Sequence, residues 1–207
     1  SVQSVAVSAD GEYIAVGSED DKFYLFDKDS STPLWTYTTG QYVRAVDISA
    51  DGEYIVMGSW DCKISLFKKG SNTPLWSKTL SDEWGDESEV YALAISADGE
   101  YIAIGSFDNK IYFFDKDSST PLWSYTTGGD ANSVAISADG EYIAAGSSDY
   151  KVYLFAKDEF DPSLSKSKDL VGGVVGRKPG CGREFIVRQN ADSDHDDVGI
   201  HCLGRAT

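Results

Sequence analysis

The sequence predicts an all-β fold, a β-propeller of four-stranded antiparallel blades, from a tandem repeat and two side-chain patterns within it. The heptapeptide SADGEYI begins at Ser8, Ser49, Ser96 and Ser137, so successive copies start 41, 47 and 41 residues apart. A period of about 40 residues made of short extended segments is typical of propeller blades. We therefore expect four blades over residues 1–169, at about 1–40, 41–87, 88–128 and 129–169, and a tail of different composition over 170–207.

The first repeat contains four segments with the composition of β-strands, at residues 5–8, 12–18, 22–27 and 34–38. Asp10-Gly11, between the first two segments, is a strong hairpin signal. Asp20-Asp21 suits a tight turn into the third segment. Pro33 precedes the fourth segment, because an outermost strand tolerates the loss of one ladder donor. The counterparts of Asp20 in the other repeats are expected to form the same turn; they are Asp61, Asp108 and Asp149.

The side chains of the third segment indicate that each sheet is covered on both faces. Phe23 and Leu25 point to one side of the strand, and Tyr24 and Phe26 to the other, so both sides are apolar. An antiparallel strand has this pattern when sheets pack against both of its faces. Small residues dominate the first two segments of each repeat and large aromatic residues the last two. Radial blades require this gradient, because they crowd near the axis and spread at the rim.

The repeated run SADGEYI-x-x-GS-x-D-x-K resembles the WD-repeat blade, and the TPLW that follows it resembles the outer strand of pyrroloquinoline-quinone-type repeats. The resemblance covers residues 1 to about 165, and it implies a non-catalytic scaffold whose tryptophans stabilise blade docking. The chain departs from the WD pattern, because both of its histidines lie in the tail. The Asp-His-Ser-Trp relay of WD repeats therefore cannot form. The WD dipeptide is likewise replaced, by Phe26-Asp27 in the first repeat.

Two sets of positions vary between otherwise matching repeats, and the WD resemblance places both on the top rim of the blades. The residue before each turn aspartate is Glu19, Trp60, Phe107 or Ser148, and the innermost strand begins with Gln3, Arg44, Tyr91 or Asn132. Aromatic and arginine side chains dominate binding hot spots. The longer connection over residues 80–90 brings Trp84 near Trp60. We expect a protein partner to bind Glu19, Arg44, Trp60, Trp84, Tyr91, Phe107, Asn132 and Ser148; neutral drift between duplicated blades is the alternative.

Composition and motifs exclude several other functions. The formal charge of −16 at pH 7 disfavours nucleic acid and anionic membrane surfaces. Asp192, Asp194 and Asp196 have the spacing of a calcium loop, but Asp197 stands where that loop requires glycine, so we expect no metal. No catalytic residue and no cofactor is expected either, because near-identical blades lack the diversity from which a catalytic site is assembled. A glycan-binding, lectin-like propeller and a fragment of a quinone-dependent dehydrogenase are the alternative functions.

Ring closure has two solutions at this stage. Four blades are fewer than most propellers use, and Leu164 in the fourth repeat replaces the outer-strand tryptophan found at Trp123 in the third. Two chains would form a homodimer with one eight-bladed ring, or the four blades would close alone or with help from the tail.

The tail is predicted to contain a β-hairpin that packs on the last blade. Its strands are expected at residues 184–188 and 198–202, and the ending QNADSDHDDVGIHC resembles the last strands of formylglycine-generating-enzyme and lectin-like modules. Cys181 and Cys202 either form a disulfide or remain thiols.

Overall fold

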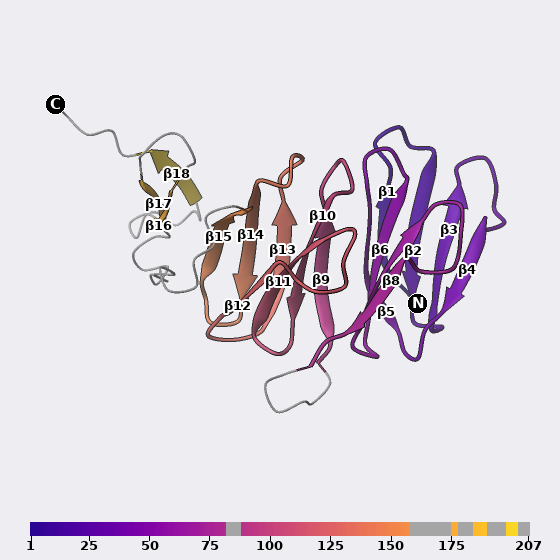
Figure 1. The fold of residues 1–207 in the computed structure, drawn as a ribbon, viewed down its shortest axis with the longest axis horizontal. Coiled ribbons are helices and arrows are strands. Elements are labelled where there is room, and N and C mark those ends of the chain that lie inside the picture. Colours follow the sequence, from indigo (N-terminus) through magenta and orange to yellow (C-terminus); the bar gives the residue numbers. More distant parts are fainter. Residues whose placement is uncertain (82–87, 158–174, 178–183, 190–197, 203–207) are drawn as a thin grey trace.

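The computed structural model describes residues 1–81, 88–157, 175–177, 184–189 and 198–202, and over residues 1–157 it consists of four antiparallel sheets (Figure 1). The first sheet comprises β1 (Val2–Val7), β2 (Tyr13–Ser18), β3 (Lys22–Asp27) and β4 (Trp35–Thr38). The second comprises β5 (Val43–Ile48), β6 (Tyr54–Ser59), β7 (Lys63–Lys68) and β8 (Trp76–Thr79). The third comprises β9 (Val90–Ile95), β10 (Tyr101–Ser106), β11 (Lys110–Asp115) and β12 (Trp123–Thr126). The fourth comprises β13 (Ala131–Ile136), β14 (Tyr142–Ser147) and β15 (Val152–Ala156).

The predicted four-stranded antiparallel blade is confirmed in the first three sheets, whose strands lie side by side in chain order. The bounds of β3 are those that the sequence predicts, and the other strands of the first sheet differ from prediction by at most three residues at an end. In the fourth sheet the described residues form three strands, and the expected outermost strand falls on residues outside the described part. Within the described residues, no helix is long and apolar enough to span a membrane.

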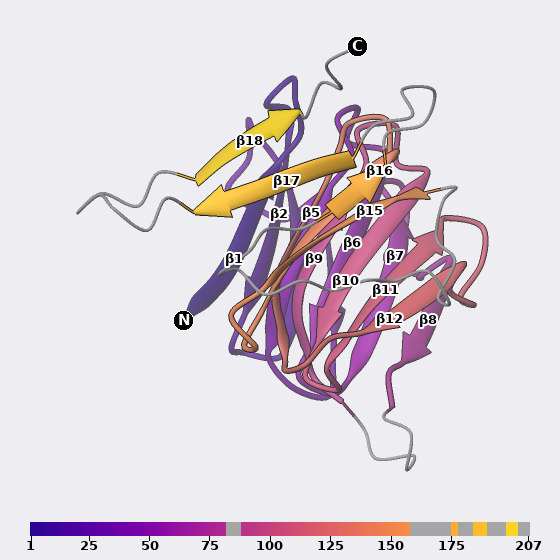
Figure 2. The same cartoon turned by 90° about the vertical axis from the view of Figure 1, so that its left-hand side faces the viewer.

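The tail contains a further three-stranded antiparallel sheet of β16 (Val175–Arg177), β17 (Glu184–Gln189) and β18 (Val198–Cys202). β17 and β18 pair with Phe185 opposite Cys202, over the two ranges where a hairpin is expected. β16 approaches β15 of the fourth blade, and Figure 2 shows this sheet at the end of the stack nearest the viewer. Cys181 and the aspartates with calcium-loop spacing lie outside the described residues.

The repeated SADGEYI heptapeptide forms the hairpin turn between the first two strands of each blade. In the first blade Ser8 Oγ donates to Asp10 Oδ1 (2.6 Å), and the Tyr13 amide donates back to Ser8 Oγ (3.0 Å). The Ser8 hydroxyl thereby lowers the pKa of the Asp10 carboxyl. Gly11 has a φ of 74°, which glycine adopts without strain. The same turn recurs at Ser49, Ser96 and Ser137, so local hydrogen bonding accounts for the serine and the aspartate of the repeat.

Blades dock because a glycine in the second strand lets the next blade approach closely. A Cβ atom at Gly58 would lie 2.3 Å from Val90 Cγ1, and one at Gly105 would lie 2.4 Å from the Ala131 carbonyl oxygen. Real Cβ contacts are longer, so any larger residue would push the blades apart. Around this contact, buried aliphatic and aromatic side chains of adjacent blades form shared clusters; Phe23 of the first blade, for example, packs with Phe67 of the second.

Hydrogen bonds repeat along the stack at its inner and outer edges. At the inner edge each SADGEYI turn donates to the next: Ala9 N to the Ala50 oxygen (2.9 Å), Ala50 N to Ala97 (2.9 Å) and Ala97 N to Ala138 (3.0 Å). At the outer edge the tryptophans of two TPLW segments donate through Nε1 to the next blade, Trp35 to the Lys69 carbonyl and Trp76 to the Lys116 carbonyl (2.7 Å each). These bonds agree with the docking role expected for the tryptophans.

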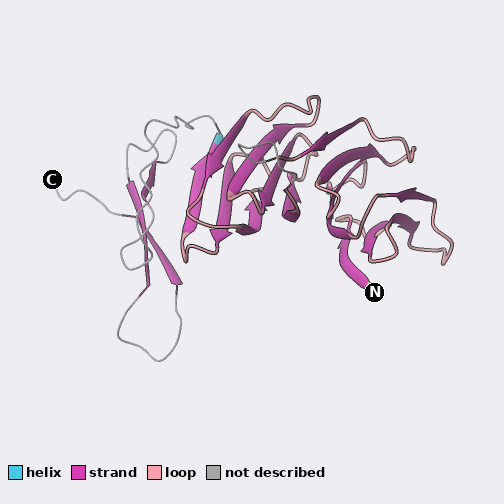
Figure 3. Ribbon diagram, turned by 90° about the horizontal axis from the view of Figure 1, so that it is seen from below, coloured by secondary structure: helices cyan, strands magenta, loops and turns pink. Residues whose placement is uncertain are grey.

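The four sheets form an open arc, with the first and fourth at opposite ends (Figures 1 and 3). Val5 in β1 is 64% exposed, whereas its counterpart Val46 in β5, which the first blade covers, is 6% exposed. The hypothesis that the four blades close into a ring by themselves is therefore not what the structure shows.

The turn between the second and third strands predicts a stabilising substitution. The residue after the turn aspartate has a positive φ in every blade, and it is Asp21, Cys62, Asn109 or Tyr150. Asparagine and aspartate tolerate this conformation, whereas it strains other residues with a Cβ by about 1 kcal/mol. The Tyr150 side chain is 88% exposed, so its removal sacrifices little packing. Tyr150→Asn should raise the free energy of unfolding by about 1 kcal/mol in urea titrations.

The third blade offers the reverse substitution as a control. Asn109→Tyr should lower the free energy of unfolding, because it introduces the strain that Tyr150→Asn removes. An unchanged or reduced stability of Tyr150→Asn would contradict the account of this turn.

Candidate functional site

The rim lies where the innermost strand of each blade begins and the second strand ends, and the structure joins the two variable sets of positions there. Each blade contributes one pair, formed by one residue of each set. Contacts define the pairs as Gln3 with Glu19, Arg44 with Trp60, Tyr91 with Phe107, and Asn132 with Ser148. The sequence predicts both sets at the rim, but it does not predict that they pair.

The two end blades carry polar pairs. Gln3 Nε2 donates to the Glu19 carboxylate, which also accepts from the N-terminal ammonium of Ser1 (3.1 Å). These bonds lower the pKa of the Glu19 carboxyl, and the bond to Ser1 has the largest effect. In the fourth blade, Asn132 Nδ2 donates to Ser148 Oγ (2.8 Å). Polar side chains therefore flank the two middle blades at the rim.

The two middle blades carry five side chains that form an aromatic band: Tyr42, Arg44, Trp60, Tyr91 and Phe107. Arg44 Cζ lies 5.9 Å from the centre of the Trp60 ring, and the centre of the Tyr42 ring lies 5.7 Å from it. The Tyr91 and Phe107 rings are 5.8 Å apart. Burial raises the pKa of Tyr91, Glu89 and Asp130 raise it further, and the Arg44 charge opposes them, so Arg44 lies within electrostatic reach of both pairs.

Exposure divides the band into an accessible surface and its support. Phe107 is 52% exposed and Tyr42 is 42% exposed, whereas Arg44, Trp60 and Tyr91 are half-buried. The sequence does not predict Tyr42 as a site residue, because it precedes the innermost strand; its only signal is an aromatic residue in a connection. Trp84, which is predicted to lie beside Trp60, falls outside the described residues.

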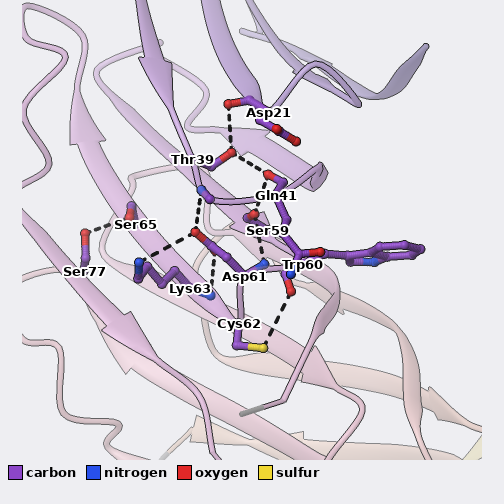
Figure 4. Close-up of polar contacts among 11 residues, drawn as sticks. Asp21, Thr39, Gln41, Ser59, Trp60, Asp61, Cys62, Lys63, Ser65 and Ser77 are labelled. Atoms are coloured by element: carbon purple, nitrogen blue, oxygen red, sulfur yellow. Dashed lines mark hydrogen bonds and ion pairs between the residues drawn. The ribbon is translucent and has the colours of Figure 1, made fainter.

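Hydrogen bonds on both sides of Trp60 fix the backbone that carries it (Figure 4). Ser59 Oγ donates to the Gln41 carbonyl (2.9 Å), which ties the end of β6 to the connection from the first blade. Asp61 Oδ2 accepts from the Gly40 amide (2.8 Å), and Asp61 Oδ1 accepts from the Lys63 amide (3.3 Å). Asp61 is therefore a turn former, as predicted, and it also anchors the neighbouring blade's connection.

A tyrosine of the third strand hydrogen-bonds to the turn aspartate in three of the four blades. The Tyr24 hydroxyl donates to Asp20 Oδ2 (2.5 Å), and Tyr112 and Tyr153 donate to Asp108 and Asp149 in the same way. Burial and the bond to Asp149 raise the pKa of Tyr153. In the second blade Ser65 takes the tyrosine's position and instead shares a hydrogen bond with Ser77 (2.7 Å).

Asp47 places a carboxylate in β5, the innermost strand of the second blade. Its counterparts in the other repeats are alanines. Oδ1 accepts from the Ile48 amide and Oδ2 from the Ile95 amide of the next blade, both at 2.9 Å. Burial nevertheless raises the pKa of Asp47. Within the described residues, no group of three or more His, Cys, Asp or Glu side chains is placed to hold a metal. Asp47 is thus a link between blades, held by two backbone amides.

Comparison with known proteins gives one family. The family model described as outer membrane protein assembly factor BamB, whose repeats are of the pyrroloquinoline-quinone type, matches residues 2–138. The match spans the first three blades and the innermost strand of the fourth. No curated protein matches the sequence. The match supports the outer-strand resemblance read from TPLW, whereas nothing in it supports the WD resemblance or that of the tail.

The raised pKa of Asp47 predicts the pH dependence of Asp47→Asn. A carboxyl whose pKa is higher in the folded protein stabilises the fold below the ordinary pKa of aspartate, and this contribution is lost as pH rises through the raised value. The free energy of unfolding of Asp47→Asn, relative to the unsubstituted protein, should therefore increase from about pH 3 to pH 7. Urea titrations across that range measure it.

Asp51→Asn is the matched control with the opposite sign. The Ser49 hydroxyl lowers the pKa of Asp51, so its contribution is present at neutral pH and lost as pH falls. Asp51→Asn should therefore lose relative stability as pH rises. If the relative stability of both variants changed in the same direction with pH, the raised pKa of Asp47 would be refuted.

Proposed function

The chain belongs to the outer membrane protein assembly factor BamB family of propeller repeats, and from that premise we propose that it is a non-catalytic scaffold that binds a protein partner through its rim. The family description names a role in assembly, which requires protein contacts rather than catalysis. The aromatic band is the observation that carries the proposal. Its five side chains lie at the rim of the two middle blades, at positions that vary between otherwise matching repeats.

The band has the physical properties of a binding hot spot. Its rings already contact one another, so a partner would lose little side-chain entropy in ordering them. The exposed ring of Phe107 provides apolar area, and Arg44 provides a planar cation for a carboxylate or carbonyl oxygen of the partner. A partner of matching chemistry presents an apolar or aromatic anchor beside an acidic or carbonyl group.

The polar pairs of the end blades complete the expected anatomy of an interface. Protein interfaces place aromatic and arginine residues at the centre and polar, solvated residues around them. Here Glu19 with Gln3 and Asn132 with Ser148 flank the aromatic band on either side. They contribute hydrogen bonding and register, while the band contributes most of the affinity.

Two other functions are compatible with this family and fold. A lectin-like propeller would stack sugar rings on the band, and a fragment of a quinone-dependent dehydrogenase would bind the quinone. Both predict a small-molecule ligand, so a glycan array and a titration with pyrroloquinoline quinone plus calcium distinguish them from the scaffold.

Truncation of the band tests the scaffold. The double substitution Trp60→Ala with Phe107→Ala should weaken binding of the captured partner protein by at least about 100-fold, because each residue is expected to behave as a hot spot. Affinity capture identifies the partner, and calorimetric titration with the purified partner measures the change. The midpoint of thermal unfolding should shift by only a few degrees, since Phe107 is exposed and Trp60 is half-buried.

Exposed leucines away from the rim provide the control. Leu75→Ala with Leu122→Ala removes two side chains that are 52% and 54% exposed beside the outermost strands, and it should leave binding unchanged. Equal loss in both double variants, or collapse of the fold in the first, would refute a binding role for the band. Ligand binding in the glycan or quinone titrations that depends on Trp60 and Phe107 would replace the scaffold by that alternative.

A further inference from the structure

We propose that the two open ends of the arc bind a second copy of this chain, so that two chains close one eight-bladed ring. The face of the fourth blade in each chain would dock on the first blade of the other. The proposal concerns the flat faces of the end blades, and it is independent of what binds at the rim.

The three interfaces inside the chain define what such a contact needs. Each blade lays its innermost strand over the two innermost strands of the blade before it: β5 over β1 and β2, β9 over β5 and β6, and β13 over β9 and β10. The approaching strand contributes aliphatic side chains. The receiving face contributes the glycine of its second strand and apolar residues of its third.

The first blade presents an approaching strand that no described residue receives. Val2, Val5 and Val7 of β1 are between 60 and 64% exposed. The equivalent residues of the second blade are Val43, Val46 and Ile48, and each of these is at most 7% exposed. The three valines thus retain the apolar character of an internal interface at a position that no other described residue covers.

The fourth blade presents the complementary receiving face. Val152 of β15 is 39% exposed, whereas its counterparts Phe23, Ile64 and Ile111 are fully buried by the next blade. Gly146 is the counterpart of Gly58. A Cβ atom at Gly58 would lie 2.3 Å from Val90, but among the described residues one at Gly146 would meet only Ser133 Cβ, at 3.9 Å. Among the described residues, nothing fills at Gly146 the space that a valine fills at Gly58.

Two contacts that repeat between successive blades are also left without a partner at the first and fourth blades, among the described residues. A tyrosine ring packs against the turn glycine of the next blade three times, as Tyr13 on Gly52, Tyr54 on Gly99 and Tyr101 on Gly140. A Cβ atom at Gly11 of the first blade would meet no described residue within 4 Å, and Tyr142 of the fourth blade is the remaining tyrosine. The inner ladder of backbone bonds similarly leaves Ala138 N and the Ala9 carbonyl as its two ends within the described residues. A second copy would join both pairs.

The C-terminal sheet contacts the fourth blade at its third strand. β16 approaches the fourth blade at β15, the third strand, whereas the approaching strand of each internal interface lies over the two innermost strands and meets the third strand only through its apolar side chains. β13 and β14 are the strands on which β1 of the second copy would lie.

The number of blades in a closed ring favours a second copy of this chain as the partner. Both unmatched faces belong to one chain, so each copy supplies what the other lacks. Propellers typically contain four to eight blades, and the four blades of this chain leave the arc open. The next multiple is eight, from two chains related by a two-fold axis through two identical contacts.

The experiment measures the solution mass of the 207-residue chain by sedimentation equilibrium over a range of concentrations. Twice the 22.5 kDa of one chain is expected. Gly146→Val fills the receiving space and Val5→Asp places a charge on the approaching strand, so each variant should sediment as a single chain that still unfolds cooperatively, at a lower midpoint because association no longer stabilises it. Ser124→Val, an exposed substitution on β12, should remain a dimer.

Mixing the two disrupted variants tests the head-to-tail geometry. The Gly146→Val chain retains its first-blade face and the Val5→Asp chain retains its fourth-blade face, so their mixture should recover a species of two chains through one intact contact. A single-chain mass for the unsubstituted protein overturns the proposal. A dimer that Gly146→Val leaves intact would also overturn it, because such a dimer would pair two first blades. Open-ended polymerisation would overturn it as well.

Discussion

The close approach of an innermost strand to the glycine of the preceding blade is the contact on which the rest of this structure depends. It requires Gly17, Gly58 and Gly105, because a Cβ atom at any of them would lie within 2.8 Å of the neighbouring strand. It also requires that each blade be apolar on both faces, so a single blade cannot bury its own hydrophobic surface. The fold is therefore cooperative along the stack, as in other repeat proteins whose units are stable only beside neighbours.

This dependence determines where function can reside. The glycine, the turn residues of SADGEYI and the tryptophan of TPLW all take part in docking or in local hydrogen bonds, so substitution there costs stability. Residues at the rim are free of that requirement. Trp60 lies between Ser59 and Asp61, whose side chains hold the turn, and its own ring contacts Tyr42 and Arg44. A rigid backbone thus presents a variable side chain, which is the arrangement that binding surfaces favour.

Much of the blade is predictable because its signals are local. Asp10-Gly11 specifies a hairpin, and the alternation of Phe23, Tyr24, Leu25 and Phe26 specifies a strand covered on both faces. The structure contains the hairpin, and it buries both faces of the equivalent strands β7 and β11 in the middle blades. Features that depend on contacts between strands or between repeats are not predictable. The sequence does not show that Arg44 lies beside Trp60, because the two are joined only by the register of β5 on β6. Asp47 escapes prediction because its significance lies in an amide of another blade, Ile95.

Amide hydrogen exchange tests the central claim, that each blade is held by its neighbour, most directly. The amides of Ala9, Ala50 and Ala97 lie in turns, where exchange is ordinarily fast, but each donates to a carbonyl of the next blade. If docking is cooperative, these three amides will exchange as slowly as those of the central strands, through global unfolding. If these amides exchange as fast as free loop amides while the strand amides stay protected, the claim is contradicted, because each blade would then be folded without docking on its neighbour.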